Sequence, residues 1–218
     1  MVYVLSDIHG NERRFNSILE QINLQSDDIL YILGDVVDRH PEGIRILRKI
    51  MKMPNVKMLL GNHEYMMLNA LGCPYDAADD TNELLQRKAL RLWYSNGGKV
   101  THDSLKHLRK TQRLEIVEFL RALPLNLDVT VNGTQYKLVH GAPVEDFDNA
   151  TYDNPTQFAV WERRYRYPQR VKNNGGEPTV HGVCRIDGGQ HMGAAFRLRK
   201  DASPFCLIKT AAGRSVVV

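Results

Sequence analysis

The first 60 or so residues repeat one pattern three times, and this repeat constrains the fold more than any other feature of the chain. A short apolar run is followed each time by a polar cluster: VYVL (2–5) by SDIHGN, ILYIL (29–33) by GDVVDRH, and VKMLL (56–60) by GNHEY. Between the runs, apolar residues recur at helical spacing, and Pro41 is suited to open the second helix. The pattern predicts a β-α-β-α-β unit with parallel strands, whose polar clusters share one carboxyl edge of a sheet. That edge is where open α/β sheets bind ligands.

The remainder of the chain predicts further layers around this unit. Residues 80–122 have mainly helical periodicity, with a glycine-containing loop at SNGGKVT, and we expect a small helical cap over about residues 75–125. LDVTVNGTQYKLVHG alternates around Asn132-Gly133, which predicts a β-hairpin that delivers His140 to a strand end. The tail over residues 194–218 has the alternating and apolar runs of further strands. The default expectation is a single domain over residues 1–218.

Composition restricts the class of protein. A hydrophobic fraction of 43% over 218 residues is enough for one full core, and the net charge of +4 indicates tolerance of anionic ligands. No run approaches the roughly 20 apolar residues that span a bilayer, and the start MVYVLSDIHG is unlike a signal peptide. The 3 cysteines lack metal or disulfide spacing. We therefore expect a cytoplasmic protein without a membrane partner.

The polar residues at the expected strand ends have the composition of a metal site. They are Asp7, His9, Asp35, Asp38, Arg39, Asn62, His63, Glu64, His140 and His181. Carboxylate, imidazole and amide donors together suit Mn, Fe or Zn ions. Two nearby cations need a bridging carboxylate, for which Asp35 is the natural candidate, and such a pair favours hydrolysis of phosphate esters. Gly34 and Gly61 allow the sharp strand exits that such a site needs.

Several blocks of this sequence resemble a known family. SDIHG, GDVVDRH and GNHE are similar to the GDxHG, GDxxDRG and GNHE signatures of the phosphoprotein phosphatases, a family of calcineurin-like metallophosphoesterases. LWYSNGGKVT and LVHGAP are similar to later segments of its bacterial and bacteriophage-type serine/threonine branch. The resemblance implies an α/β fold of αββα type, in which helices flank a central β-sandwich.

The resemblance also implies a role for each matching residue. Asp7, His9 and Asp35 would bind a first metal, and Asp35, Asn62, His140 and His181 a second, with Mn the most expected ion. His63 would protonate the leaving group, Asp38 would orient the His63 ring, and Arg39 would bind phosphate. The role of Glu64 is left open between a supporting contact and none.

Two features depart from the family pattern, His40 and the block TVHGVCRIDGG, and a third segment leaves its role open. In VWERRYRYPQRVK (160–172), Arg163 is the expected second phosphate ligand and Arg164 the next candidate, while a nucleic-acid patch or a solvated charge cluster are the alternatives. His40 replaces the family glycine, so the loop beside Arg39 takes another path or adds an imidazole. TVHGVCRIDGG is shorter than the family's last block, so His191 is the alternative to His181.

The expected activity is hydrolysis of phosphoserine and phosphothreonine in one step, by attack of a metal-bound hydroxide. The partner would be a phosphorylated protein or peptide and the protein a monomer. Symmetrical diadenosine tetraphosphate hydrolases share the same blocks and are the alternative function. A phosphate- or RNA-binding module without catalysis is a further alternative, which the complete set of acid and metal residues disfavours.

Overall fold

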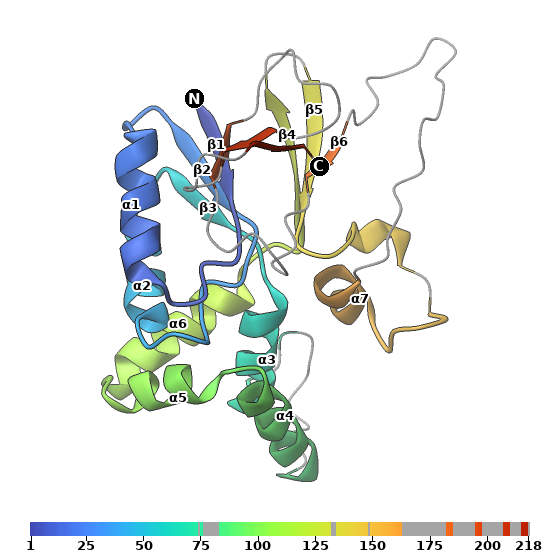
Figure 1. Cartoon of the computed structure of the whole chain (residues 1–218). Coiled ribbons are helices and arrows are strands. Elements are labelled where there is room, and N and C mark those ends of the chain that lie inside the picture. Colours follow the sequence, from blue (N-terminus) through green and yellow to red (C-terminus); the bar gives the residue numbers. More distant parts are fainter. Residues whose placement is uncertain are drawn as a thin grey trace.

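The computed structural model describes residues 1–73, 75, 83–131, 134–147 and 149–162, together with the backbone of four short later strands (Figure 1). Those strands are β6 (Gly182–Cys184), β7 (Ala195–Arg197), β8 (Leu207–Lys209) and β9 (Ser215–Val217). β8 and β9 pair in an antiparallel manner. Strands were predicted for the tail of the chain, and β7, β8 and β9 confirm that prediction.

The repeat at the start of the chain folds as predicted. Its elements are β1 (Val2–Leu5), α1 (Glu12–Ile22), β2 (Ile29–Ile32), α2 (Gly43–Ile50) and β3 (Val56–Met58). β2 pairs in parallel with both β1 and β3, and β7 joins the other edge of β1 in the antiparallel direction. Helix α2 begins two residues later than Pro41, because Pro41 and Glu42 form a turn before the first helical residue.

The period of two in the strands divides their side chains between two cores. Tyr3 and Leu5 face α1 and α2, which cover one side of the first sheet in Figure 1 and contribute apolar residues such as Phe15 and Leu47. Val4 and Leu33 face the opposite side. The strands are therefore buried on both faces, as continuous apolar runs such as ILYIL require.

A second sheet packs on the face that α1 and α2 leave uncovered. It consists of β4 (Asn126–Val131), β5 (Thr134–Val139) and β6, in that order. β4 and β5 form the predicted antiparallel pair, although the Asn132-Gly133 turn itself lies outside the described residues. Leu138 and Val131 of this sheet contact Val4, Tyr31 and Leu33 of the first sheet. The predicted β-sandwich is confirmed.

The helices that follow β3 gather below the carboxyl ends of the first three strands in Figure 1. They are α3 (Asn62–Ala70), α4 (Glu83–Ser95), α5 (Lys99–Lys106) and α6 (Lys110–Arg121). The predicted helical region is thus confirmed, and residues 96–98 within SNGGKVT join α4 to α5. A 3₁₀ turn, η1 (Val144–Asp146), and α7 (Pro155–Trp161) follow β5. None of the described helices combines the length and the apolar character that crossing a bilayer requires.

We predict that Leu138→Ala lowers the free energy of unfolding by about 2–5 kcal/mol, because it opens a cavity between the two sheets. Leu138 is fully buried, whereas Leu127 on β4 packs in the same cluster but is half-buried. Leu127→Ala should therefore have a smaller effect. Urea denaturation measures both variants, and equal losses would contradict the described packing between the sheets.

Candidate metal centre

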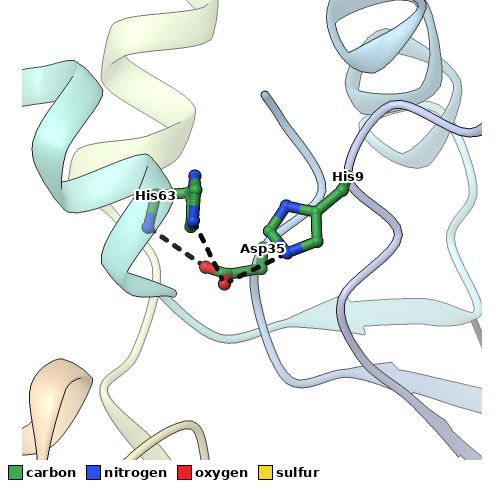
Figure 2. A group of neighbouring side chains, drawn as sticks. All are labelled: His9, Asp35 and His63. Atoms are coloured by element: carbon green, nitrogen blue, oxygen red, sulfur yellow. Dashed lines mark hydrogen bonds and ion pairs between the residues drawn. The ribbon is translucent and has the colours of Figure 1, made fainter. Parts of the chain in front are cut away.

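Six of the predicted site residues meet at the carboxyl ends of the parallel strands. They are Asp7, His9, Asp35, Asn62, His63 and His140, and all six side chains are buried. Asp35 lies at the centre, with His9 and His63 on either side of its carboxylate in Figure 2. His9 Nε2 and His63 Nε2 lie 3.7 and 3.9 Å from Asp35 Oδ2, and His140 Nε2 lies 3.6 Å from Oδ1. The three imidazoles thus converge on one carboxylate.

Two buried donor atoms of this cluster are left without a hydrogen bond inside the described part of the chain. Asp7 Oδ2 and His9 Nε2 are buried and have no hydrogen-bond partner among the described residues. His9 Nδ1 contacts the Val37 carbonyl at 3.2 Å, which turns Nε2 toward Asp7 Oδ1, 3.5 Å away. Because a buried polar atom without a partner is destabilising, these atoms fit a metal ion.

His140 is held in the same way from the second sheet. Its Nδ1 contacts the Leu33 carbonyl at 2.6 Å, and its Nε2 lies 2.8 Å from Asn62 Oδ1. The Leu33 carbonyl on Nδ1 thereby fixes the ring with Nε2 facing the amide oxygen of Asn62. A backbone carbonyl on one ring nitrogen is the usual means of orienting a metal-binding histidine. The donor set of His140 and Asn62 therefore also fits a cation.

The backbone around the cluster is strained. Five residues without the freedom of glycine adopt positive φ angles between 46° and 72° in these loops: Asp7, His9, Asp35, Asp38 and Arg39. Gly34 has φ +100°, and a Cβ there would lie 2.5 Å from Gly61 Cα. The two glycines therefore let the loops after β2 and β3 come into contact, which adds to the sharp strand exits expected of them. Such strain is typical of functional sites.

Glu64 holds these loops together, which answers the question that the sequence left open. Its Oε2 accepts hydrogen bonds from the backbone N–H groups of Asp35 at 2.8 Å and Gly61 at 3.2 Å. Its Oε1 accepts from those of Val36 at 2.8 Å and Val37 at 3.2 Å. Burial, together with the Asp35 carboxylate, raises the pKa of Glu64, and the backbone donors oppose that rise. Glu64 thus supports the loop that carries Asp35.

The charge at the centre is controlled by the surrounding histidines. Burial opposes ionisation of Asp35, but His140, His63 and His9, with the backbone N–H of His63, outweigh burial and lower the pKa of Asp35 to about 2. The His63 N–H donates to Asp35 Oδ1 at 3.1 Å. Asp35 is therefore ionised over the whole neutral range, as a bridging metal ligand must be.

His63 forms a second buried pair next to Asp35. Its Nδ1 lies 2.7 Å from Asp38 Oδ2, and burial, which lowers the pKa of His63, is outweighed by Asp35 and Asp38, which raise it. His9, Asp35 and His63 could themselves hold an ion, since their donor atoms lie within 4.8 Å of one another. A raised pKa, however, favours the protonated imidazole, which cannot bind metal.

Two residues that sequence reasoning did not assign to the site hold Asp38 in place. Trp93 Nε1 donates to both Asp38 oxygens, at 3.0 and 2.9 Å, and the Asp38 N–H donates to Thr101 Oγ1 at 2.9 Å. Both residues lie in LWYSNGGKVT, a segment that resembles the family. That resemblance could have pointed to them, but it assigned no role to either residue. A Cβ on Gly98 would lie 2.3 Å from Trp93 Nε1, so the glycine makes room for the indole.

The remaining candidates lie at the margin of the site or outside the described residues. Arg39 is exposed, and its guanidinium Nη2 lies 3.4 Å from His63 Nε2. His40 is the residue that replaces the family glycine. Its Nδ1 lies 2.8 Å from the backbone carbonyl of His9, so the His40 ring contacts the loop that carries Asp7 and His9. Arg163 and His181, with their alternatives Arg164 and His191, lie outside the described residues.

A β-sandwich with carboxylate, imidazole and amide donors buried at its parallel strand ends defines a class of metal-dependent hydrolases. Residues 1–191 match the family described as calcineurin-like phosphoesterase. The chain belongs to that family, and the predicted family resemblance and fold class are confirmed.

Proteins similar to this chain carry three different names. The chain is 28% identical over 167 residues to serine/threonine-protein phosphatase 2 of Salmonella typhimurium, covering 74% of this chain and 67% of that protein. It is 41% identical over 68 residues to the symmetrical bis(5'-nucleosyl)-tetraphosphatase of Wigglesworthia glossinidia brevipalpis, covering 30% of this chain and 25% of that protein. The fold is similar to the cold-active protein-tyrosine phosphatase of a psychrophilic Shewanella species, with a TM-score of 0.52, 17% identity and coverage of 99% and 79% of the two chains.

We predict that Glu64→Gln lowers the free energy of unfolding by about 1–3 kcal/mol, because an amide nitrogen would replace one acceptor and face buried N–H donors. The matched control is Glu118→Gln on the exposed side of α6, which should change stability by less than about 0.5 kcal/mol. Chemical denaturation compares the two variants. A Glu64→Gln protein as stable as its control would show that the carboxylate does not hold the loop.

Proposed function

We propose that this phosphoesterase is a metal-dependent serine/threonine protein phosphatase. The observation that carries the proposal is the buried His63–Asp38 pair beside Asp35, which supplies a proton donor next to a set of metal donors. Among the relatives, the protein phosphatase of Salmonella is similar over 74% of this chain, against 30% for the tetraphosphatase of Wigglesworthia. That difference supports a protein substrate.

The proposal includes two divalent ions, with Mn²⁺ as the preferred metal. Asp7, His9 and Asp35 would hold the first ion, and Asp35, Asn62, His140 and His181 the second. The donor chemistry of oxygen and imidazole, together with the unpartnered atoms of Asp7 and His9, supports this assignment. When bound, such an ion pair supplies water activation near neutral pH and stabilises negative charge on phosphate oxygens.

His63 would act as the general acid of the reaction. Because Asp38 accepts at Nδ1, the ring is fixed with Nε2 facing Asp35 Oδ2, 3.9 Å away. The raised pKa keeps a proton on Nε2, which can pass to the leaving alkoxide of a serine or threonine. Trp93 and Thr101 keep Asp38 in the position that this requires.

Arginines would bind the phosphate itself. Arg39 lies beside His63, and its planar guanidinium can donate to two phosphate oxygens at once. The resemblance adds Arg163 as a second phosphate ligand. In this arrangement the phosphate would lie between the arginines and the ions held by Asp35. Its leaving group would point at His63.

Hydrolysis of symmetrical dinucleoside tetraphosphates is the second candidate function. The observation that favours it is the 41% identity to the Wigglesworthia enzyme, which is higher than the 28% identity to the Salmonella phosphatase although it extends over fewer residues. The same metal and acid residues would serve both reactions. Substrate choice would then depend on the surroundings of the site.

A paired assay tests the proposal. We predict Mn²⁺-dependent phosphate release from a phosphothreonine peptide that is faster than nucleotide release from diadenosine tetraphosphate. Chelation of the metal should abolish the reaction, and added Mn²⁺ should restore it, because the donor set needs its ions for catalysis. Faster turnover of diadenosine tetraphosphate would instead identify the protein as a dinucleotide hydrolase. Turnover that survives chelation would contradict the metal-dependent mechanism.

We predict that His63→Ala keeps its metals but loses about 10²–10⁴ in rate on a phosphoserine peptide, the usual contribution of a positioned general acid. The loss should be smaller on an aryl phosphate, since a phenolate leaves without full protonation. Metal content measured by elemental analysis separates this role from metal binding. Equal wild-type and variant rates on the peptide would eliminate His63 as the acid.

A further inference from the structure

A basic groove lies between α2 and α5, outside the metal centre. The groove has a volume of about 670 Å³, and its lining includes the cations Arg45, Arg48, Lys49 and Lys52. These four residues follow the helical spacing i, i+3, i+4 and i+7, so they lie on one face of α2 and the turn that ends it. The two helices are in contact, and Ser104 Oγ of α5 donates to the Pro41 carbonyl at 3.0 Å.

Most of the positive charge in this groove is not neutralised within the described part of the chain. Arg45 pairs with Glu12, and Lys49 donates to the neutral Asn16 amide at 2.9 Å. Arg48 and Lys52 form no side-chain hydrogen bond or ion pair with any described residue. Glu42 is the one carboxylate in the lining. The groove therefore carries an excess of cations that an anionic partner would neutralise.

The rest of the lining favours a peptide over a nucleic acid. Pro41, Ile44 and Leu108 are the apolar residues of the lining. The lining, which lies wholly within the described residues, contains no Phe, Tyr or Trp, and His107 is its one aromatic ring on which a base could stack. A lining that combines apolar and cationic side chains matches a segment that alternates acidic and apolar side chains.

The groove also begins close to the proposed phosphate site. Pro41 follows Arg39 by two residues, so their Cα atoms are at most about 7 Å apart. Along α2 the groove follows about 10 Å of helix. An extended peptide covers that length with about three to four residues.

We propose that this groove docks an acidic segment of the phosphoprotein substrate, a few residues from the phosphorylated side chain. That the segment belongs to a substrate rests on the proposed phosphatase function. The charge and shape of the groove do not depend on it. Docking there would lower KM for acidic substrates and leave the chemistry at the metal centre to the residues described above.

Direct binding tests the groove independently of catalysis. The probe is a fluorescent, unphosphorylated peptide of alternating Asp, Glu and Leu, and the readout is anisotropy at low ionic strength. Arg48→Gln/Lys52→Gln should weaken its binding about fivefold or more, as expected for the loss of two surface ion pairs. The matched control, Lys88→Gln/Arg91→Gln, removes two exposed cations from α4 and should bind as the wild type does.

Three results would overturn the proposal. They are no binding to the wild type, equal binding by the groove variant, or tighter groove-dependent binding of an RNA of the same charge. Phosphate release from two phosphothreonine peptides, one with the acidic segment and one with Asn and Gln in its place, then tests the link to function. We expect a lower KM for the acidic peptide in the wild type and equal KM values in the groove variant. Binding in the groove with no phosphate release from either peptide would instead reject the phosphatase function alone.

Discussion

The buried carboxylate of Glu64 is the interaction on which the metal centre depends. From the first turn of α3 it accepts four backbone N–H groups, three of them from the loop that carries Asp35. Those donors would otherwise be buried without partners, which is strongly unfavourable. The contact joins the end of β2 to the start of α3, and it thereby sets the distance between Asp35 and His63.

Strain and unpaired polar atoms are concentrated around this contact. Asp7, His9 and Asp35 all have positive φ angles, and buried atoms of Asp7 and His9 lack partners among the described residues. Each feature is unfavourable for folding, and together they are stable because two apolar layers enclose the strands that carry them. The donor atoms therefore hold their positions before a cation binds. The stability of the two apolar layers maintains that arrangement.

The helical region contributes to the function in two separate places. Through Trp93 and Thr101 it holds Asp38, and through Asp38 it controls the orientation and the pKa of His63. On the side of α5 it completes the basic groove of α2. Catalysis and docking would therefore both depend on helices that contribute no predicted metal ligand, which gives this region a function beyond covering the sheet.

The sequence by itself determined the parallel strands, the helices between them and the clusters at their ends, because apolar periodicity and glycine positions act over a few residues. It also identified Asp7, His9, Asp35, Asn62, His63 and His140, which the tertiary structure brings together. The supporting contacts could not be predicted in this way. Trp93 meets Asp38 across 55 positions and His140 meets Leu33 across 107, and no local pattern encodes such pairs. Likewise, the groove between α2 and α5 exists only once the two helices pack, because neither of them alone encloses a space.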